Sequence, residues 1–126
     1  MKIEVRASNV PISEPLALHI VQRLKFALRR YASRVEHVVV RLVDLNGPKG
    51  GPDKRCTLSA QLSSPGERLL AAAIDADAYV AVSQAAARLD ARATRVIRRA
   101  RESSRPRLGR FRGGTRATRA RPRTVV

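Results

Sequence analysis

Aromatic residues are scarce in this 126-residue chain, which holds two Phe, two Tyr and no Trp. Stacking of aromatic rings on unpaired bases can therefore make up only a small part of any RNA recognition. The single cysteine, Cys56, excludes an internal disulfide and fits a reducing cytosol, so we expect a cytoplasmic protein. The first residues contain no long apolar run, which argues against a secretory signal. No stretch approaches the roughly 20 apolar residues that span a bilayer, so we expect no membrane partner.

The residue types that metal and catalytic sites require are also missing. One cysteine and two dispersed histidines make no metal site, and we expect His19 and His37 on the surface rather than as ligands or bases. The glycines of residues 46–53 join two predicted strands, so they do not form a phosphate-binding loop, which opens a helix. No spacing suggests a nucleophile, a base and an orienting group. The sequence therefore predicts a protein that is not an enzyme, with no cofactor, no metal and no small-molecule substrate.

Positive charge is abundant, and it is unevenly placed. The net formal charge is +16, from 26 Lys/Arg against 10 Asp/Glu. Half of it lies in residues 105–126, which hold eight Arg and no acid. In the remainder, the predicted helical segments 14–31 and 77–101 carry +3 and +4, whereas the strand region 32–76 is nearly balanced. Such a field speeds association with nucleic acid and makes affinity salt-dependent without specifying sequence.

The arginines of the second basic segment are predicted to share one helix face. Four of them follow at intervals of four, three and four residues: Arg88, Arg92, Arg95 and Arg99. At about 100° per residue, this spacing places them in one stripe. An apolar stripe on roughly the opposite side is predicted to face the core: Tyr79, Val82, Ala86, Leu89, Ala93, Val96 and Ala100. Only Asp90 lies among the arginines, whereas solvated faces usually mix both signs, so we favour a surface for a polyanion over a solvated face.

Hydrophobic periodicity predicts the other elements. Alternation indicates a half-buried strand at 2–7, and Ser13 is predicted to cap the helix that follows. The buried face of that helix is predicted from apolar residues at helical spacing: Leu16, Ile20, Leu24, Ala27 and Tyr31. Phe26 falls on its wet side, either as an RNA-stacking residue or as a ring folded down at the helix border. Three more strands are predicted: 35–45, 55–63 and 68–75. Asp77 is predicted to cap the last helix, which ends near Arg101.

The composition changes at Glu102. From there Arg, Gly, Pro, Thr and Ser dominate, and this segment cannot bury enough apolar area to offset its ordering entropy. Arg112-Gly113-Gly114 resembles one RGG unit of RNA-binding proteins, which is a weak signal as a single copy. We therefore predict one folded domain, 1–101, and a disordered Arg-rich tail, 102–126. The expected fold is α+β: a βαβββα two-layer sandwich, with a four-stranded sheet and two helices on one face.

This order of elements, together with two local motifs, resembles the bacterial ribosome hibernation promoting factor family, also called the ribosome-associated inhibitor or S30AE family. The start, KIEVRASNVPISE (residues 2–14), is similar to the family's opening of strand, polar turn and capped helix. More specific is Asp77-Ala78-Tyr79-Val80-Ala81-Val82, which is similar to the family's Asp-x-Tyr-x-Ala-Ile/Val at the start of the final helix. The resemblance covers about residues 1–101 and implies a double-stranded-RNA-binding-like fold.

The resemblance implies a stress-linked, ribosome-associated inhibitor of translation that binds rRNA in the decoding channel of the small ribosomal subunit. It also implies RNA contacts from basic side chains of both helices: Arg23, Lys25, Arg29, Arg30, Arg88, Arg92, Arg95, Arg98 and Arg99. Asp77 and Tyr79 match the family motif, and we interpret them as a helix cap and a core anchor. The tail resembles neither form of the family's C-terminal part, so we expect no folded dimerisation domain and no ribosome dimers formed by this chain alone.

Two other functions remain open at the level of sequence. One is a general RNA- or DNA-binding protein or chaperone driven by the Arg-rich tail. The other is a protein-interaction module that regulates transcription, as some names for the family suggest. Loss of all binding after removal of the tail would favour the first, and capture of RNA polymerase components without ribosomal proteins would favour the second.

Overall fold

The computed structural model describes residues 1–45, 53–63 and 66–104. Two compact units make up the chain, Met1–Ala93 and Thr94–Val126. The elements follow in the order β1 (Lys2–Ser8), α1 (Glu14–Ala27), η1 (Arg29–Arg34), β2 (Val35–Asp44), β3 (Lys54–Leu62), β4 (Arg68–Asp75) and α2 (Ala78–Ser104), where η1 is a 3₁₀ helix. Most of the predicted loop at 46–53 lies outside the described residues, and so does the predicted tail of 102–126 except for residues 102–104, which are helical and not, as predicted, disordered.

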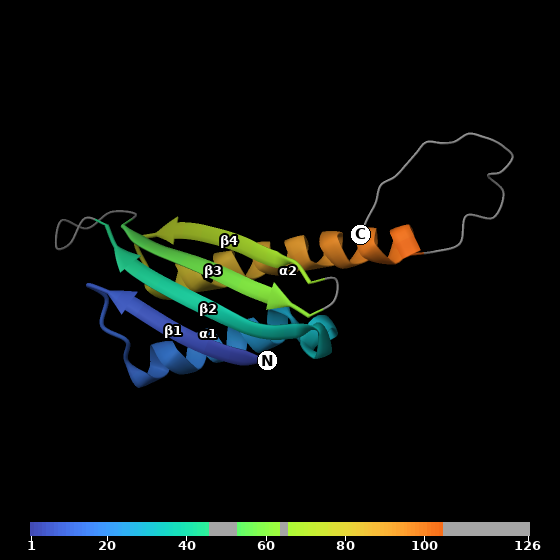
Figure 1. Cartoon of the computed structure of the whole chain (residues 1–126). Helices are drawn as coiled ribbons and strands as arrows, with labels where there is room; N and C mark the ends of the chain where they lie inside the picture. Colours follow the sequence, from blue (N-terminus) through green and yellow to red (C-terminus); the bar gives the residue numbers. More distant parts are fainter. Residues whose placement is uncertain (46–52, 64–65, 105–126) are drawn as a thin grey trace, which may run out of the picture. The chain divides into compact units, whose positions relative to one another are not determined.

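In the first unit, four strands form one mixed sheet in the order β1-β2-β3-β4 (Figure 1). β1 runs parallel to β2, with Val5 opposite Val40. β3 is antiparallel to both of its neighbours, as its alternating pattern favours, with Leu58 opposite Val40 and Ala71. α1 and the first turns of α2 lie behind the sheet in the view of Figure 1. The predicted α+β fold of order βαβββα is therefore confirmed.

The core lies on the helix-covered face of the sheet. Alternate residues of β2, β3 and β4 are buried there: Val38, Val40, Leu42, Cys56, Leu58, Ala60, Leu62, Leu69, Ala71 and Ala73. The predicted buried face of α1 is confirmed at four positions: Leu16, Ile20, Leu24 and Ala27. Tyr31 is the exception, because α1 ends at Ala27 and Tyr31 is half-buried in η1. The backbone of Leu28 leaves the α region at φ −106°, ψ 14°, while its side chain is fully buried.

The apolar seam predicted for α2 is confirmed at its centre. Four predicted residues of the first unit are buried: Val82, Ala86, Leu89 and Ala93. Ala81 and Ala85 are buried as well, so the buried face is wider than predicted. Tyr79 is not a core anchor, because it lies 39% exposed in the first turn of the helix. In the first turn of a helix, a residue that helical periodicity places on the core side can lie beyond the end of the sheet and so remain exposed.

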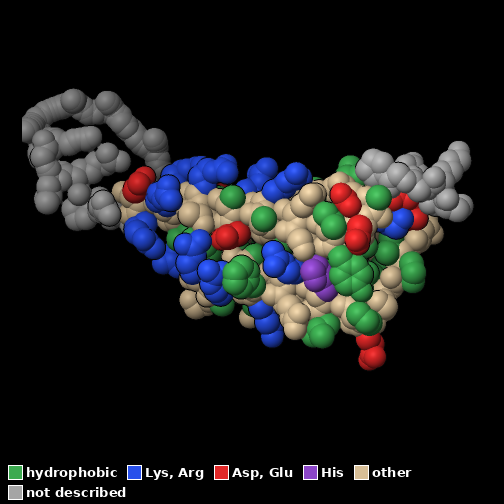
Figure 2. All heavy atoms as spheres, turned by 180° about the vertical axis from the view of Figure 1, so that it is seen from behind, with side chains coloured by type: hydrophobic (Ala, Val, Ile, Leu, Met, Phe, Trp, Pro, Cys, Tyr) green, Lys and Arg blue, Asp and Glu red, His purple; other side chains and the backbone are tan. Residues whose placement is uncertain are grey.

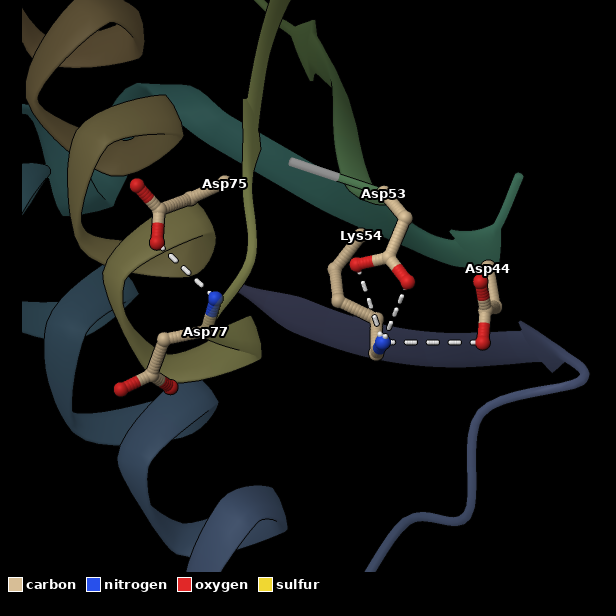
Figure 3. Close-up of polar contacts among 5 residues, drawn as sticks. All are labelled: Asp44, Asp53, Lys54, Asp75 and Asp77. Carbon is tan, nitrogen blue, oxygen red and sulfur yellow. Dashed lines mark hydrogen bonds and ion pairs between the residues drawn. The ribbon is translucent and has the colours of Figure 1, made fainter. Parts of the chain in front are cut away.

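Carboxylates cap the start of α2 (Figure 3). Oδ1 of Asp77 accepts a hydrogen bond of 2.9 Å from the backbone N–H of Tyr79, and Oδ2 of Asp75 accepts one of 2.9 Å from the backbone N–H of Asp77. The first N–H groups of a helix have no intrahelical acceptor, and an acid at this position also suits the helix dipole. The predicted capping role of Asp77 is therefore confirmed.

A second group of charges in Figure 3 joins the facing ends of β2 and β3. Nζ of Lys54 lies 3.0 Å from Oδ2 of Asp53 and 3.5 Å from Oδ2 of Asp44. Asp53 is only 1% exposed, so its carboxylate needs this partner. The hydrogen bond to Asp53 raises the pKa of Lys54 above its ordinary value. The ammonium group therefore stays charged at neutral pH and holds the two strand ends together.

Cys56 offers a probe of folding. Its thiol is fully buried in β3, and burial raises its pKa from 9.0 to about 12. Only the thiolate reacts, so at pH 9 we expect iodoacetamide to alkylate the folded protein about 500-fold more slowly than the urea-unfolded chain. Above pH 9 the unfolded chain ionises while the folded one does not, so the stability of the fold should fall as the pH rises. Mass spectrometry after timed alkylation measures the alkylation rates of the folded and unfolded chains, and equal rates would contradict the burial of Cys56.

Candidate nucleic-acid interface

Cationic side chains gather where α1 ends in the first unit. Lys25 lies in the last turn of α1, and Arg29 and Arg30 open η1; all three are exposed. Positive charge is favoured here because the last carbonyls of a helix carry a partial negative charge. Nη1 of Arg29 donates a 2.7 Å hydrogen bond to one of those carbonyls, that of Phe26. Figure 2 shows Lys and Arg side chains on the helix side of the molecule, with few acids among them.

Arg23 occupies a different environment from these three. It lies one turn before Phe26 on α1 and is half-buried. Its Nε is buried and has no hydrogen-bond partner within the described residues. Of the four predicted contacts on this side, Arg23 is therefore the half-buried one, whereas the other three are exposed.

An ion pair connects this cluster to α2 within the first unit. Nη2 of Arg30 lies 3.5 Å from Oδ1 of Asp90, the one acid that lies among the arginines of the predicted stripe in the sequence. Asp90 Oδ1 is buried and accepts no hydrogen bond within the described part of the chain, while Arg30 is exposed, so the pair contributes only about 0–1 kcal/mol and orients Arg30 more than it stabilises the fold. Asp90 therefore faces α1, and Arg92 on the same helix is left exposed with no ion pair or hydrogen bond to the residues described.

Arg88 is exposed, as predicted, but it is also tethered to the sheet. Its Nη1 donates a hydrogen bond to the backbone carbonyl of Ala72 in β4. β4 is an edge strand, and unpaired carbonyls along an edge invite pairing with other chains. One donor of Arg88 therefore already covers the sheet edge, and its predicted contact with RNA stays a prediction.

In the second unit, the described residues 94–104 are the remainder of α2. Three predicted contact residues are exposed there: Arg95, Arg98 and Arg99. The predicted seam is displaced by one residue, because Ile97 is buried while Val96 and Ala100 are half-buried. Ile97 follows Ala93 by four residues, a spacing that helical periodicity allows as readily as three.

His19 has partners that the sequence did not reveal. Its Nε2 lies 3.1 Å from the carbonyl oxygen of Tyr79 and 3.1 Å from Oγ of Ser83, and its ring centroid lies 5.0 Å from that of Tyr79. His19 therefore joins α1 to the first turns of α2. The partners are 60 and 64 residues away, so no local pattern signals the contact. His37, by contrast, is exposed on β2, as predicted.

Phe26 lies on the wet side of α1, as predicted, with 57% of its surface exposed. The Cζ atom of Arg29 lies 4.2 Å from its ring centroid, and that of Arg23 lies 5.7 Å away. Both distances fall within the range of a cation–π contact. The ring therefore sits among guanidinium groups and not in the core.

The described part of the chain holds no group of three His, Cys, Asp or Glu that could bind a metal ion. Among the helices described, none is long and apolar enough to cross a membrane.

Comparison with family models matches residues 3–101 to the sigma 54 modulation protein / S30EA ribosomal protein family. The chain belongs to this family. Its structure is similar to the N-terminal domain of Protein Y from Thermus thermophilus, at 26% identity and a TM-score of 0.62, over 76% of this chain and 99% of that one. A ribosomal subunit interface protein from Coxiella burnetii shares the fold at 17% identity and a TM-score of 0.58, over 78% and 99% of the two chains. A search of curated proteins gave no match.

Membership in the S30EA family confirms the resemblance seen in the sequence. It makes the chain one of a class of ribosome-associated factors, a class not known as enzymes. The matched segment runs from β1 into the last turns of α2 and includes all nine predicted RNA contacts.

Proposed function

We propose that this S30EA protein inhibits translation by binding rRNA in the channel of the small ribosomal subunit where messenger and transfer RNA would lie. The observation that carries the proposal is the set of exposed cations on the helices of a fold that belongs to a ribosome-associated family: Lys25, Arg29, Arg30, Arg92, Arg95, Arg98 and Arg99. A domain held there excludes messenger RNA by occupancy, so no chemical step is needed. Release when stress ends requires only that the contacts be reversible and sensitive to salt.

Arginine suits this role better than lysine. Its planar guanidinium group can hold two phosphate oxygens at once and can also stack on a base, whereas the ammonium group of lysine is a point charge. Six of the seven exposed cations named above are arginines. We therefore expect both phosphates and exposed bases among the contacts.

The outer face of the sheet also carries exposed cations, among them Lys2, Arg41 and Arg55, but one of its basic side chains is paired with an acid. Nε of Arg6 lies 2.8 Å from Oε2 of Glu4, and this hydrogen bond lowers the pKa of the Glu4 carboxyl below its ordinary value. Glu4 therefore remains an anion at neutral pH beside Arg6. Arg6 is therefore less available to a phosphate than an arginine such as Arg92, which is unpaired within the described residues.

A second candidate is general nucleic-acid binding through the eight arginines of residues 105–126. It is favoured by one observation, that this segment holds half of the net charge. Contacts of that kind would add affinity without a preference for the small subunit.

Cosedimentation separates the two candidates. Purified small and large subunits are mixed with the full chain, and with a chain cut after Ser104, at rising salt. We expect the cut chain to bind more weakly but to keep its preference for the small subunit and to inhibit translation in a cell-free assay. No association of the full chain with the small subunit at low salt would exclude the proposal, and loss of all binding on cutting would favour the second candidate.

A further inference from the structure

Phe26 is an apolar ring exposed in the middle of a cationic surface. The guanidinium group of Arg29 is 4.2 Å from the ring centroid and is held by the 2.7 Å hydrogen bond from its Nη1 to the Phe26 carbonyl. Arg23 approaches to 5.7 Å, and Lys25 and Arg30 are exposed nearby on α1 and η1. In spite of these neighbours, 57% of Phe26 remains exposed, so the ring has room for another partner.

We propose that Phe26 and Arg29 form a stacking site for one unpaired base of RNA. This inference rests on the proposed function and adds to it a contact that distinguishes unpaired from paired nucleotides. A base in a duplex is stacked on both sides, whereas a single-stranded base offers a free π face to an aromatic ring or a guanidinium plane. The flanking cations would bind the phosphates on either side of that base.

The chemistry around the ring favours a nucleotide over a protein side chain. A partner must cover a flat apolar surface and also meet the charges of Arg29 and Lys25, which a nucleotide does with its base and its phosphate. An apolar protein partner would cover the ring but leave those charges without counterions, at a cost in desolvation. Exposure of an apolar side chain does not by itself indicate a stacking site. Leu18 is 58% exposed on the same helix, but it is not aromatic and lies eight residues before Phe26, about 12 Å along the helix axis.

The absence of tryptophan from the chain allows a direct test. The variant Phe26→Trp introduces a single tryptophan at the proposed site, and the matched control Leu18→Trp introduces one at an equally exposed position on the same helix. Each full-length variant is titrated with a 12-nucleotide single-stranded RNA and with the corresponding duplex, at occupancies measured by anisotropy of labelled RNA. We expect the single strand to quench the tryptophan at position 26 strongly and the duplex to quench it weakly, with little change for the control.

Affinity measurements provide the second readout. The substitution Phe26→Ala should weaken single-strand binding about ten- to a hundredfold and leave duplex binding unchanged. The slope of log affinity against log salt should also stay unchanged, because stacking releases no counterions. Phe26→Tyr should restore most of the loss, whereas Leu18→Ala should have no effect. Because Phe26 is exposed, circular dichroism of all variants should match that of the parent chain.

Two results would overturn the stacking site: unchanged single-strand affinity of Phe26→Ala, or equal quenching of the introduced tryptophan by single strand and duplex. Cosedimentation of the unaltered chain with small subunits distinguishes this failure from failure of the proposed function. If that chain binds the subunits while Phe26→Ala behaves like it towards RNA, only the stacking site is wrong. If the unaltered chain does not bind the subunits at all, the proposed function is wrong.

Discussion

Reversal of three exposed arginines of α2 in the variant Arg92→Glu, Arg95→Glu, Arg99→Glu is expected to weaken binding to the small subunit by roughly a thousandfold or more at physiological salt. Each substitution removes a phosphate contact, together with the counterions that the contact releases, and places an anion against the rRNA. The corresponding triple alanine variant should flatten the slope of log affinity against log salt by about two to three units. Cosedimentation over a range of salt concentrations measures both effects.

The matched control changes the net charge equally on the outer face of the sheet. Lys2, Arg41 and Arg55 are exposed there, and reversing all three to Glu should reduce binding far less. Both sets are surface changes that typically cost within about 0.5 kcal/mol each, so both proteins should fold. Arg88 is left out because its substitution would also remove the hydrogen bond to Ala72, so that a change at the sheet edge could not be separated from a lost contact with RNA. Equal losses from the two sets would mean that net charge, and not α2, determines the affinity.

Truncation of Leu58 to Ala should lower the free energy of unfolding by about 2–5 kcal/mol, a large part of the 5–15 kcal/mol typical of a small protein. Leu58 is fully buried at the centre of β3, between Val40 and Ala71, so the lost methyl groups leave a cavity that its neighbours cannot fill. Urea unfolding followed by circular dichroism measures the change.

The control for this truncation is Leu70→Ala in the neighbouring strand β4. Leu70 is 55% exposed on the opposite face of the sheet, so its truncation should change the unfolding free energy by no more than about 0.5 kcal/mol. A similar cost for Leu58 and Leu70 would contradict the assignment of one buried and one wet face.

The strands could be predicted closely because their patterns are local. The prediction for β4 matches at both ends, and that for β3 is displaced by one residue. Both are close because apolar and polar residues alternate along a strand that has one buried face. The end of α1 could not be predicted in this way. Leu28 and Tyr31 continue the apolar pattern, and no Gly or Pro follows Ala27 to mark a stop, so the change to a 3₁₀ helix is invisible in the spacing.

In the candidate site, too, local features could be predicted and contacts between distant elements could not. Exposure of the α2 arginines follows from helical periodicity and was predicted. The engagement of Arg88 with Ala72 and of Arg30 with Asp90 could not be, because the partners meet only when helices pack on the sheet and on each other. Tyr79 was misassigned for a related reason: its place on the wheel is on the core side, but α1 meets it there with His19 instead of an apolar side chain.

The parallel pairing of β1 with β2 has a consequence for the order of folding. The strands β2, β3 and β4 are consecutive neighbours and can assemble as hairpins, whereas pairing Val5 with Val40 requires closing a loop that contains α1 and η1. Closing the longer loop costs more chain entropy, so we expect β1 to dock last. During synthesis, β1 and α1 leave the ribosome first but must wait for β2, and the cationic end of α1 therefore gains its fixed position late.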